Sequence, residues 1–75
     1  MPKSHSDPFL RKLGGRIKEL RAERKISQEA LAHECRIDRS YMSGIERGVR
    51  NITVLRLVNI AIALRVPPQK LLEFR

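Results

Sequence analysis

The segment Ser27–Gly48, SQEALAHECRIDRSYMSGIERG, constrains the fold of this chain more than any other. Ser27 and Asp38 are residue types that cap helix N-termini, and Gly48 can take the left-handed conformation that ends a helix. These signals predict two short helices, the second over about 39–47, with only two turn residues before the Asp38 cap. The chain is therefore expected to contain a tightly linked helix pair.

The second helix of this pair has two chemically different sides. At about 100° per residue, Tyr41, Met42 and Ile45 share one side, which can be held against a core. The other side carries the small and basic residues Arg39, Ser40, Ser43, Gly44 and Arg47. An ordinary surface helix shows the same pattern, but such a side also suits the major groove of DNA. There Arg39 can bind guanine through two hydrogen bonds, and the serines can reach base edges or phosphates.

The composition favours the DNA interpretation. The 75-residue chain has a formal net charge of +8, which indicates a polyanionic partner. It is long enough for one domain near the lower size limit of a single core, and dimerisation commonly stabilises such domains. Its one cysteine excludes an internal disulfide and fits a reducing compartment. Because it shows no signal peptide and no membrane-spanning stretch, we expect a cytoplasmic protein without a membrane partner.

The rest of the chain predicts an all-α fold. Residues 1–7 are polar and form an expected loose tail, whereas residues 8–75 form one helical domain. Asp7 and Pro8 suit the start of a first helix. Gly14 and Gly15 weaken that helix, which indicates either a close approach by another element or a late helix start.

The C-terminal third predicts two further helices. Thr53 can cap a fourth helix, whose apolar residues cover almost its whole circumference. A helix of this kind lies at the centre of a core or is shared with a partner chain. Pro67 and Pro68 stop this helix and can begin a short fifth helix.

The order of these residues resembles a known family. The chain is similar to the helix-turn-helix (XRE-type) family of phage repressors and Cro proteins over roughly residues 10–74. Within that family it looks most like the small controller proteins of restriction–modification systems. The resemblance is carried by Ser27-Gln28, Leu31-Ala32, Tyr41-Met42-Ser43, Ile45-Glu46-Arg47-Gly48, Asn51, Leu57, Ala61 and Leu64.

The resemblance implies a compact five-helix, lambda-repressor-like domain that reads DNA with its second and third helices. Gln28 matches a glutamine that holds a phosphate and braces the recognition helix. Arg21 and Glu46 match a partly buried ion pair between the first and third helices. The positions implied to contact bases are Arg39, Ser40, Ser43 and Gly44, and those implied to contact the DNA backbone are Arg47 and Asn51.

Two further residues are candidates for the DNA-binding site, and two others differ from the residues usual in the family. Arg50, in the loop beside the recognition helix, and the hydroxyl of Tyr41 are additional candidates for phosphate contacts. Arg36 replaces the glycine usual in the turn, so the left-handed conformation there carries strain or shifts. Ile52 stands where proline is common, which leaves that loop less rigid.

Other chemistry is less favoured. Glu46 has no second acid, histidine or nucleophile at a workable spacing, so we do not expect an enzyme. His33 and Cys35 diverge by about 200° on a helix and cannot share a metal ion, and no metal or cofactor is expected. Cys35 is interpreted as a small core residue in preference to a redox switch.

The sequence therefore predicts a sequence-specific regulator of transcription that binds a palindromic, double-stranded DNA operator as a homodimer. RNA polymerase is a further candidate partner. The alternative is an antitoxin-type module that binds a protein as well as DNA. The expected dimer interface, unless the fifth helix folds back on its own core, is Ile62, Val66, Leu71, Leu72 and Phe74.

Overall fold

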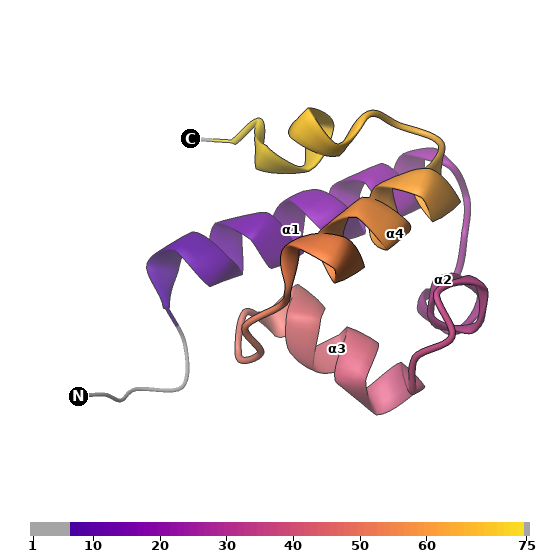
Figure 1. The fold of residues 1–75 in the computed structure, drawn as a ribbon, viewed down its shortest axis with the longest axis horizontal. Helices are drawn as coiled ribbons and strands as arrows, with labels where there is room; N and C mark the ends of the chain where they lie inside the picture. The colour runs from indigo at the N-terminus through magenta and orange to yellow at the C-terminus, as the bar shows by residue number, and fades with distance from the viewer. Residues whose placement is uncertain (1–6, 75) are drawn as a thin grey trace.

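The computed structural model describes residues 7–74, which form four α-helices and one short 3-10 helix and contain no strand. Figure 1 shows α1 crossing behind α4, with α3 below them and α2 at one end. The expected tail over residues 1–7 lies, except for Asp7, outside the described residues. The elements are α1 (Pro8–Glu23), α2 (Gln28–Glu34), α3 (Arg39–Arg47), α4 (Val54–Leu64) and the 3-10 helix η1 (Pro68–Leu72).

The all-α prediction is confirmed, but the fifth helix differs from the expectation. It is a 3-10 helix of five residues, and Phe74 lies beyond its end. Pro67 and Pro68 set an extended entry and a fixed first helical residue, and so short a segment adopts the tighter 3-10 geometry. The two glycines near the start of the chain do not delay the first helix, because α1 begins at Pro8 and runs through both of them without a break.

Each α-helix begins at a side chain that caps it. In every case the capping oxygen accepts a hydrogen bond from a backbone N–H in the first turn, at 2.8 to 3.1 Å. These bonds satisfy donors that would otherwise lack a partner inside the helix. All four helix starts were predictable from residue type, and the caps are Asp7, Ser27, Asp38 and Thr53.

The helix ends use left-handed residues. Gly48 ends α3 with φ of 78°, as predicted. Arg36 has φ of 57°, so the turn between α2 and α3 keeps its left-handed geometry although an arginine occupies it. Lys25 and Arg65 adopt the same conformation after α1 and at the end of α4. A residue with a Cβ pays roughly 1–2 kcal/mol for this conformation, so the turns are held by the packing around them.

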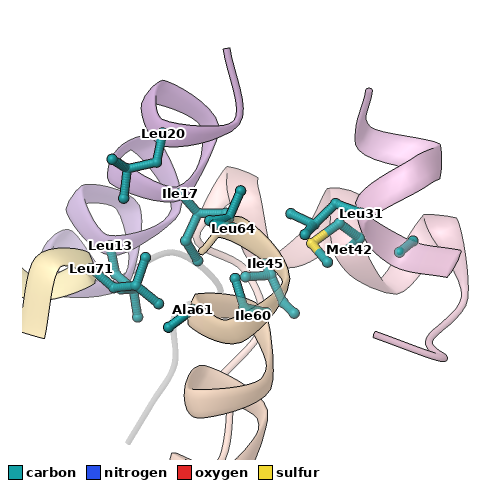
Figure 2. Close-up of a cluster of buried hydrophobic side chains, with 11 residues drawn as sticks. Leu13, Ile17, Leu20, Leu31, Met42, Ile45, Ile60, Ala61, Leu64 and Leu71 are labelled. Carbon is teal, nitrogen blue, oxygen red and sulfur yellow. The ribbon is translucent and has the colours of Figure 1, made fainter. Parts of the chain in front are cut away.

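The core is formed by aliphatic side chains from every element. Figure 2 shows the side chains of α1, α3 and α4 meeting, with Leu31 of α2 packed beside Met42. Burial of these side chains is the main term that stabilises a domain of this size. The core consists of Leu13, Ile17, Leu20, Leu31, Ala32, Met42, Ile45, Ile60, Ala61, Leu64 and Leu71.

The expected dimer interface needs a correction, because Leu71 is fully buried within its own chain. Val66 and Phe74 are partly buried against the same core, and Phe74 packs edge-to-face on Phe9 at 5.3 Å. The segment after α4 therefore folds back on its own domain, which was the alternative weighed from the sequence. Only Ile62 and Leu72 of the expected set remain largely exposed, at 67% and 46%.

One side of α4 is left open to solvent. Leu55 is 75% exposed and Val54 is 74% exposed, and Ile62 lies two turns further along. The opposite side of α4, with Ile60 and Leu64, enters the core. The apolar circumference predicted from the sequence thus divides into a core side and an uncovered side. Among residues 7–74, no helix is both long and apolar enough to span a membrane.

The two neighbouring glycines of α1 give a direct test of the close approach between α1 and α3. A Cβ at Gly14 would lie 2.4 Å from the backbone oxygen of Ile45, whereas a Cβ at Gly15 would meet nothing within 4 Å. Gly14→Ala is expected to destabilise the protein by about 1–3 kcal/mol through overpacking against backbone. Gly15→Ala is expected to stabilise it by up to about 1 kcal/mol through helix propensity. Urea denaturation of both variants measures the difference, and equal effects would contradict the proposed packing.

Candidate nucleic-acid interface

The polar side of α3 and the start of α2 share one shallow hollow on the surface. Arg39, Ser40 and Arg47 are exposed there, and Met42 and Ile45 on the opposite side of α3 are buried in the core. The structure thus brings together most of the residues that the sequence assigned to DNA. The hollow is lined by Gln28, Asp38, Arg39, Ser40, Ser43 and Arg47.

Gly44 does not lie on the open surface, contrary to the sequence-based expectation. It is buried, and a Cβ placed on it would lie 2.7 Å from Cγ of Arg50 and 3.5 Å from Cγ2 of Val49. The space left by the missing side chain is occupied by the residues that follow α3. A helical wheel cannot show this covering, because it comes from a loop that folds back over the helix.

The hydroxyl groups of the hollow are engaged within their own helix. Ser40 donates a short hydrogen bond from its hydroxyl to the Asp38 carboxylate, which also accepts from the Ser40 backbone N–H. These donors lower the pKa of Asp38 below its ordinary value. The guanidinium of Arg47 donates from Nε to Oγ of Ser43 at 3.3 Å. The Ser43 hydroxyl therefore lies beside a basic group, whereas the Ser40 hydroxyl is oriented by the Asp38 carboxylate.

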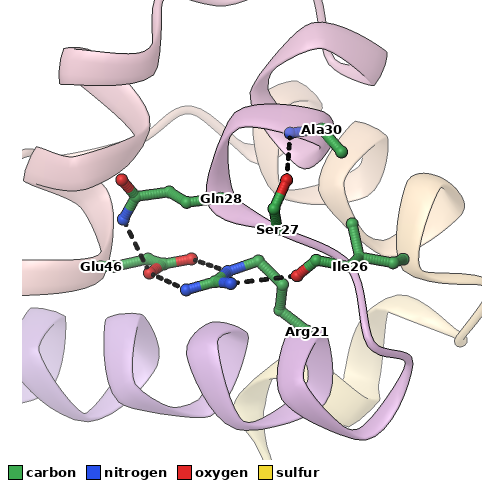
Figure 3. Close-up of polar contacts among 6 residues, drawn as sticks. All are labelled: Arg21, Ile26, Ser27, Gln28, Ala30 and Glu46. Atoms are coloured by element: carbon green, nitrogen blue, oxygen red, sulfur yellow. Dashed lines mark hydrogen bonds and ion pairs between the residues drawn. The ribbon is translucent and has the colours of Figure 1, made fainter.

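An ion pair fixes α3 to α1, as the resemblance implied. Arg21 of α1 donates from Nε to Glu46 Oε2 at 2.8 Å and from Nη2 to Oε1 at 3.0 Å (Figure 3). The side chains are only 15% and 4% exposed. The hydrogen-bonded Glu46 carboxylate raises the pKa of Arg21 above its ordinary value, against the opposing effect of burial. The bidentate geometry is the strong form of an arginine–carboxylate pair.

Gln28 and a loop carbonyl complete this network. Gln28 donates from Nε2 to Glu46 Oε1 at 3.0 Å, and Arg21 donates from Nη1 to the backbone oxygen of Ile26 at 3.0 Å (Figure 3). The network therefore connects α1, the loop before α2, the first residue of α2 and the last turn of α3. This is the bracing role that the resemblance implied for Gln28.

Three more residues extend the surface beyond the hollow. Arg50 and Asn51 are exposed in the loop after α3, and Tyr41 is half-buried against the core. The guanidinium of Arg50 lies over the ring of Tyr41, at 5.3 Å from its centre. Arg56 of α4, which was not predicted to belong to this surface, has its guanidinium 4.9 Å from the same ring centre. No spacing signal links Arg56 to Tyr41, because the two residues meet only through the packing of α4.

Cys35 lies beside α4 and away from this surface. Its Sγ is 3.9 Å from the backbone oxygen of Asn59, and burial raises the pKa of the thiol. A raised pKa lowers the fraction of reactive thiolate at neutral pH. Within residues 7–74, no three His, Cys, Asp or Glu side chains are grouped closely enough to hold a metal ion.

The buried ion pair predicts a large difference between two glutamate substitutions. Glu46→Gln leaves the Arg21 guanidinium beside a neutral amide, and we expect a loss of about 3–5 kcal/mol in the free energy of unfolding. Glu19 pairs with Arg16 but is itself 63% exposed, so it serves as the control in which the carboxylate is solvated, and Glu19→Gln should cost less than about 1 kcal/mol. Urea denaturation of both variants tests this, and similar losses would show that the Arg21–Glu46 pair is not a structural anchor.

The chain is similar in sequence and fold to known helix-turn-helix proteins. A family model described as helix-turn-helix matches residues 17–71. Control protein C.BamHI of Bacillus amyloliquefaciens is 42% identical over 62 residues, which cover 81% of this chain and 76% of C.BamHI. The crystal structure of the restriction–modification controller protein C.AhdI from Aeromonas hydrophila superposes with a TM-score of 0.81 at 44% identity, covering 83% of this chain and 94% of C.AhdI.

A further solved structure contains DNA. The restriction–modification controller protein C.Esp1396I, as a tetramer in complex with its natural 35 base-pair operator, superposes with a TM-score of 0.80 at 38% identity. The match covers 91% of this chain and 90% of that protein. The chain belongs to the helix-turn-helix (XRE-type) family of DNA-binding transcription regulators and is similar to the restriction–modification controller proteins within it.

Proposed function

We propose that this protein regulates transcription by inserting α3 into the major groove of a specific DNA operator. The observation that carries the proposal is the exposed, basic and hydroxyl-bearing side of α3, held rigidly to α1 by the Arg21–Glu46 pair. A rigid recognition helix positions its side chains within the small tolerance that base-edge hydrogen bonds require. The similarity to C.AhdI and to operator-bound C.Esp1396I supports this role.

The proposed contacts divide into two classes. Arg39 at the start of α3 reads a guanine, with Ser40 and Ser43 reaching neighbouring base edges. The phosphate contacts come from the surrounding residues, and the net charge of +8 supplies the long-range attraction. The proposed phosphate-contacting residues are Gln28, Tyr41, Arg47, Arg50 and Asn51. Gly44 contributes by giving space to Arg50 and does not itself face the groove.

The similarity to controller proteins supports a narrower biological role. We propose that the protein controls transcription within a restriction–modification system, because the similar protein C.AhdI is named a restriction–modification controller protein and C.BamHI is named a control protein. The position of the operator relative to the promoter would decide between repression and activation. Activation would include a contact with RNA polymerase.

Substitution of Arg39 tests the assignment of base recognition. Arg39→Ala is expected to weaken binding to the selected operator by about 1–3 kcal/mol and to relax the preference at one base position. Arg47→Ala is the matched control, because loss of a phosphate contact weakens cognate and scrambled duplexes equally. Fluorescence anisotropy with both duplexes gives the affinity ratio. If Arg39→Ala leaves the ratio of cognate to scrambled affinity unchanged, Arg39 does not take part in base recognition.

We also propose that the protein binds a palindrome as a symmetric homodimer. The open side of α4, with Leu55 and Ile62, together with Leu72 of η1, is the apolar surface that a second copy would cover. Two recognition helices related by a two-fold axis would lie about 34 Å apart, one DNA turn. The proposed interface keeps Ile62 and Leu72 of the expected set, adds Leu55 and leaves out the residues that pack against their own core.

The dimer proposal predicts that a charge on α4 separates the subunits. Ile62→Glu puts a carboxylate into the proposed interface, and sedimentation equilibrium at micromolar concentration should show a shift from dimer to monomer. Ala22→Glu places the same charge on an exposed position of α1 and should leave the mass unchanged. A wild-type protein that sediments as a monomer would refute the dimer.

A further inference from the structure

The ring of Tyr41 is shared by two arginines from different parts of the chain. The guanidinium of Arg50, in the loop after α3, lies 5.3 Å from the ring centre. The guanidinium of Arg56, in the first turn of α4, lies 4.9 Å from it. Both distances are within the range in which the ring's electrons attract a cation. The ring itself is half-buried and packed against the core, so it offers a fixed platform.

The part of the Arg50 side chain that is close to its own backbone is also constrained. A Cβ at Gly44 would come within 2.7 Å of Cγ of Arg50, so this side chain lies directly across the bare backbone of α3. Arg50 is thus constrained at two points along its length, first by α3 at Gly44 and then by the ring of Tyr41. A long, exposed side chain would otherwise sample many rotamers.

We propose that Arg56 is a positioning residue of the DNA-binding surface, acting through the Tyr41 ring to hold Arg50 in its binding orientation. This inference rests on the proposed function. Two guanidinium groups at one ring repel each other, so Arg56 restricts the part of the ring that Arg50 can occupy. An arginine ordered before binding loses less conformational entropy when it meets a phosphate or a base.

The first arm of the test uses the free protein. Tyr41 is the only tyrosine and the chain has no tryptophan, so its ring resonances are unambiguous by NMR. We expect ring-current shifts on the Arg50 side-chain protons that change in Arg56→Gln, persist in Tyr41→Phe and vanish in Tyr41→Leu. Arg50 resonances that are identical in the wild type and in Arg56→Gln would overturn the proposal without bearing on DNA binding.

The second arm measures binding to a duplex that the wild-type protein selects from a random-sequence pool. Arg56→Gln should weaken binding by between about 2-fold and 10-fold, the range expected for ordering one arginine side chain. The same substitution should have no further effect in an Arg50→Ala background, because its target is then absent. Thermal denaturation of each variant verifies that the fold is intact.

Salt dependence separates positioning from direct contact. A positioning residue leaves the slope of log affinity against log salt unchanged, whereas loss of a phosphate contact reduces this slope by about one. A reduced slope, or additive effects of Arg56→Gln and Arg50→Ala, would overturn the positioning role and leave the proposed function standing. Failure of the wild-type protein to select any duplex would overturn the proposed function together with this role.

Discussion

The position of the polar side of α3 depends on the hydrogen-bonded ion pair between Arg21 and Glu46. The helices α2 and α3 have only seven and nine residues, lengths at which isolated helices are marginal in water. Their stability and their relative orientation must therefore come from contacts with α1 and α4. The apolar core supplies most of that stability and holds the side of α3 that carries Met42 and Ile45. The bidentate pair, which Gln28 also joins, adds directional hydrogen bonds that connect the last turn of α3 to α1 and α2.

Local chemistry made much of the fold predictable. The four capping side chains and Gly48 determine where helices begin and end through bonds within a few residues, so residue type alone locates them. The separation of Met42 and Ile45 from Arg39 and Ser40 follows from helical periodicity in the same way. The Arg21–Glu46 contact, 25 residues apart, was accessible only through family resemblance.

The parts that were missed depend on contacts between distant segments. Gly44 lies on the polar side of α3 by periodicity, yet the loop that carries Arg50 covers it. Leu71 belongs to an apolar tail whose direction is set by packing of η1 on the core, so the sequence left open whether it lies in the core or at a dimer interface. Arg56 joins the candidate site because α4 brings its first turn to Tyr41. Helical periodicity describes the sides of one helix and gives no information on its contacts with other segments.

Three left-handed turns of this chain are occupied by positively charged residues, Lys25, Arg36 and Arg65. Glycine would relax each turn, but three such replacements would remove three positive charges and lower the net charge from +8 to +5. Long-range attraction to a polyanion weakens as that total falls. The basic residues in these turns therefore raise the conformational energy of the backbone, but they also strengthen the electrostatic attraction between the domain and a polyanion.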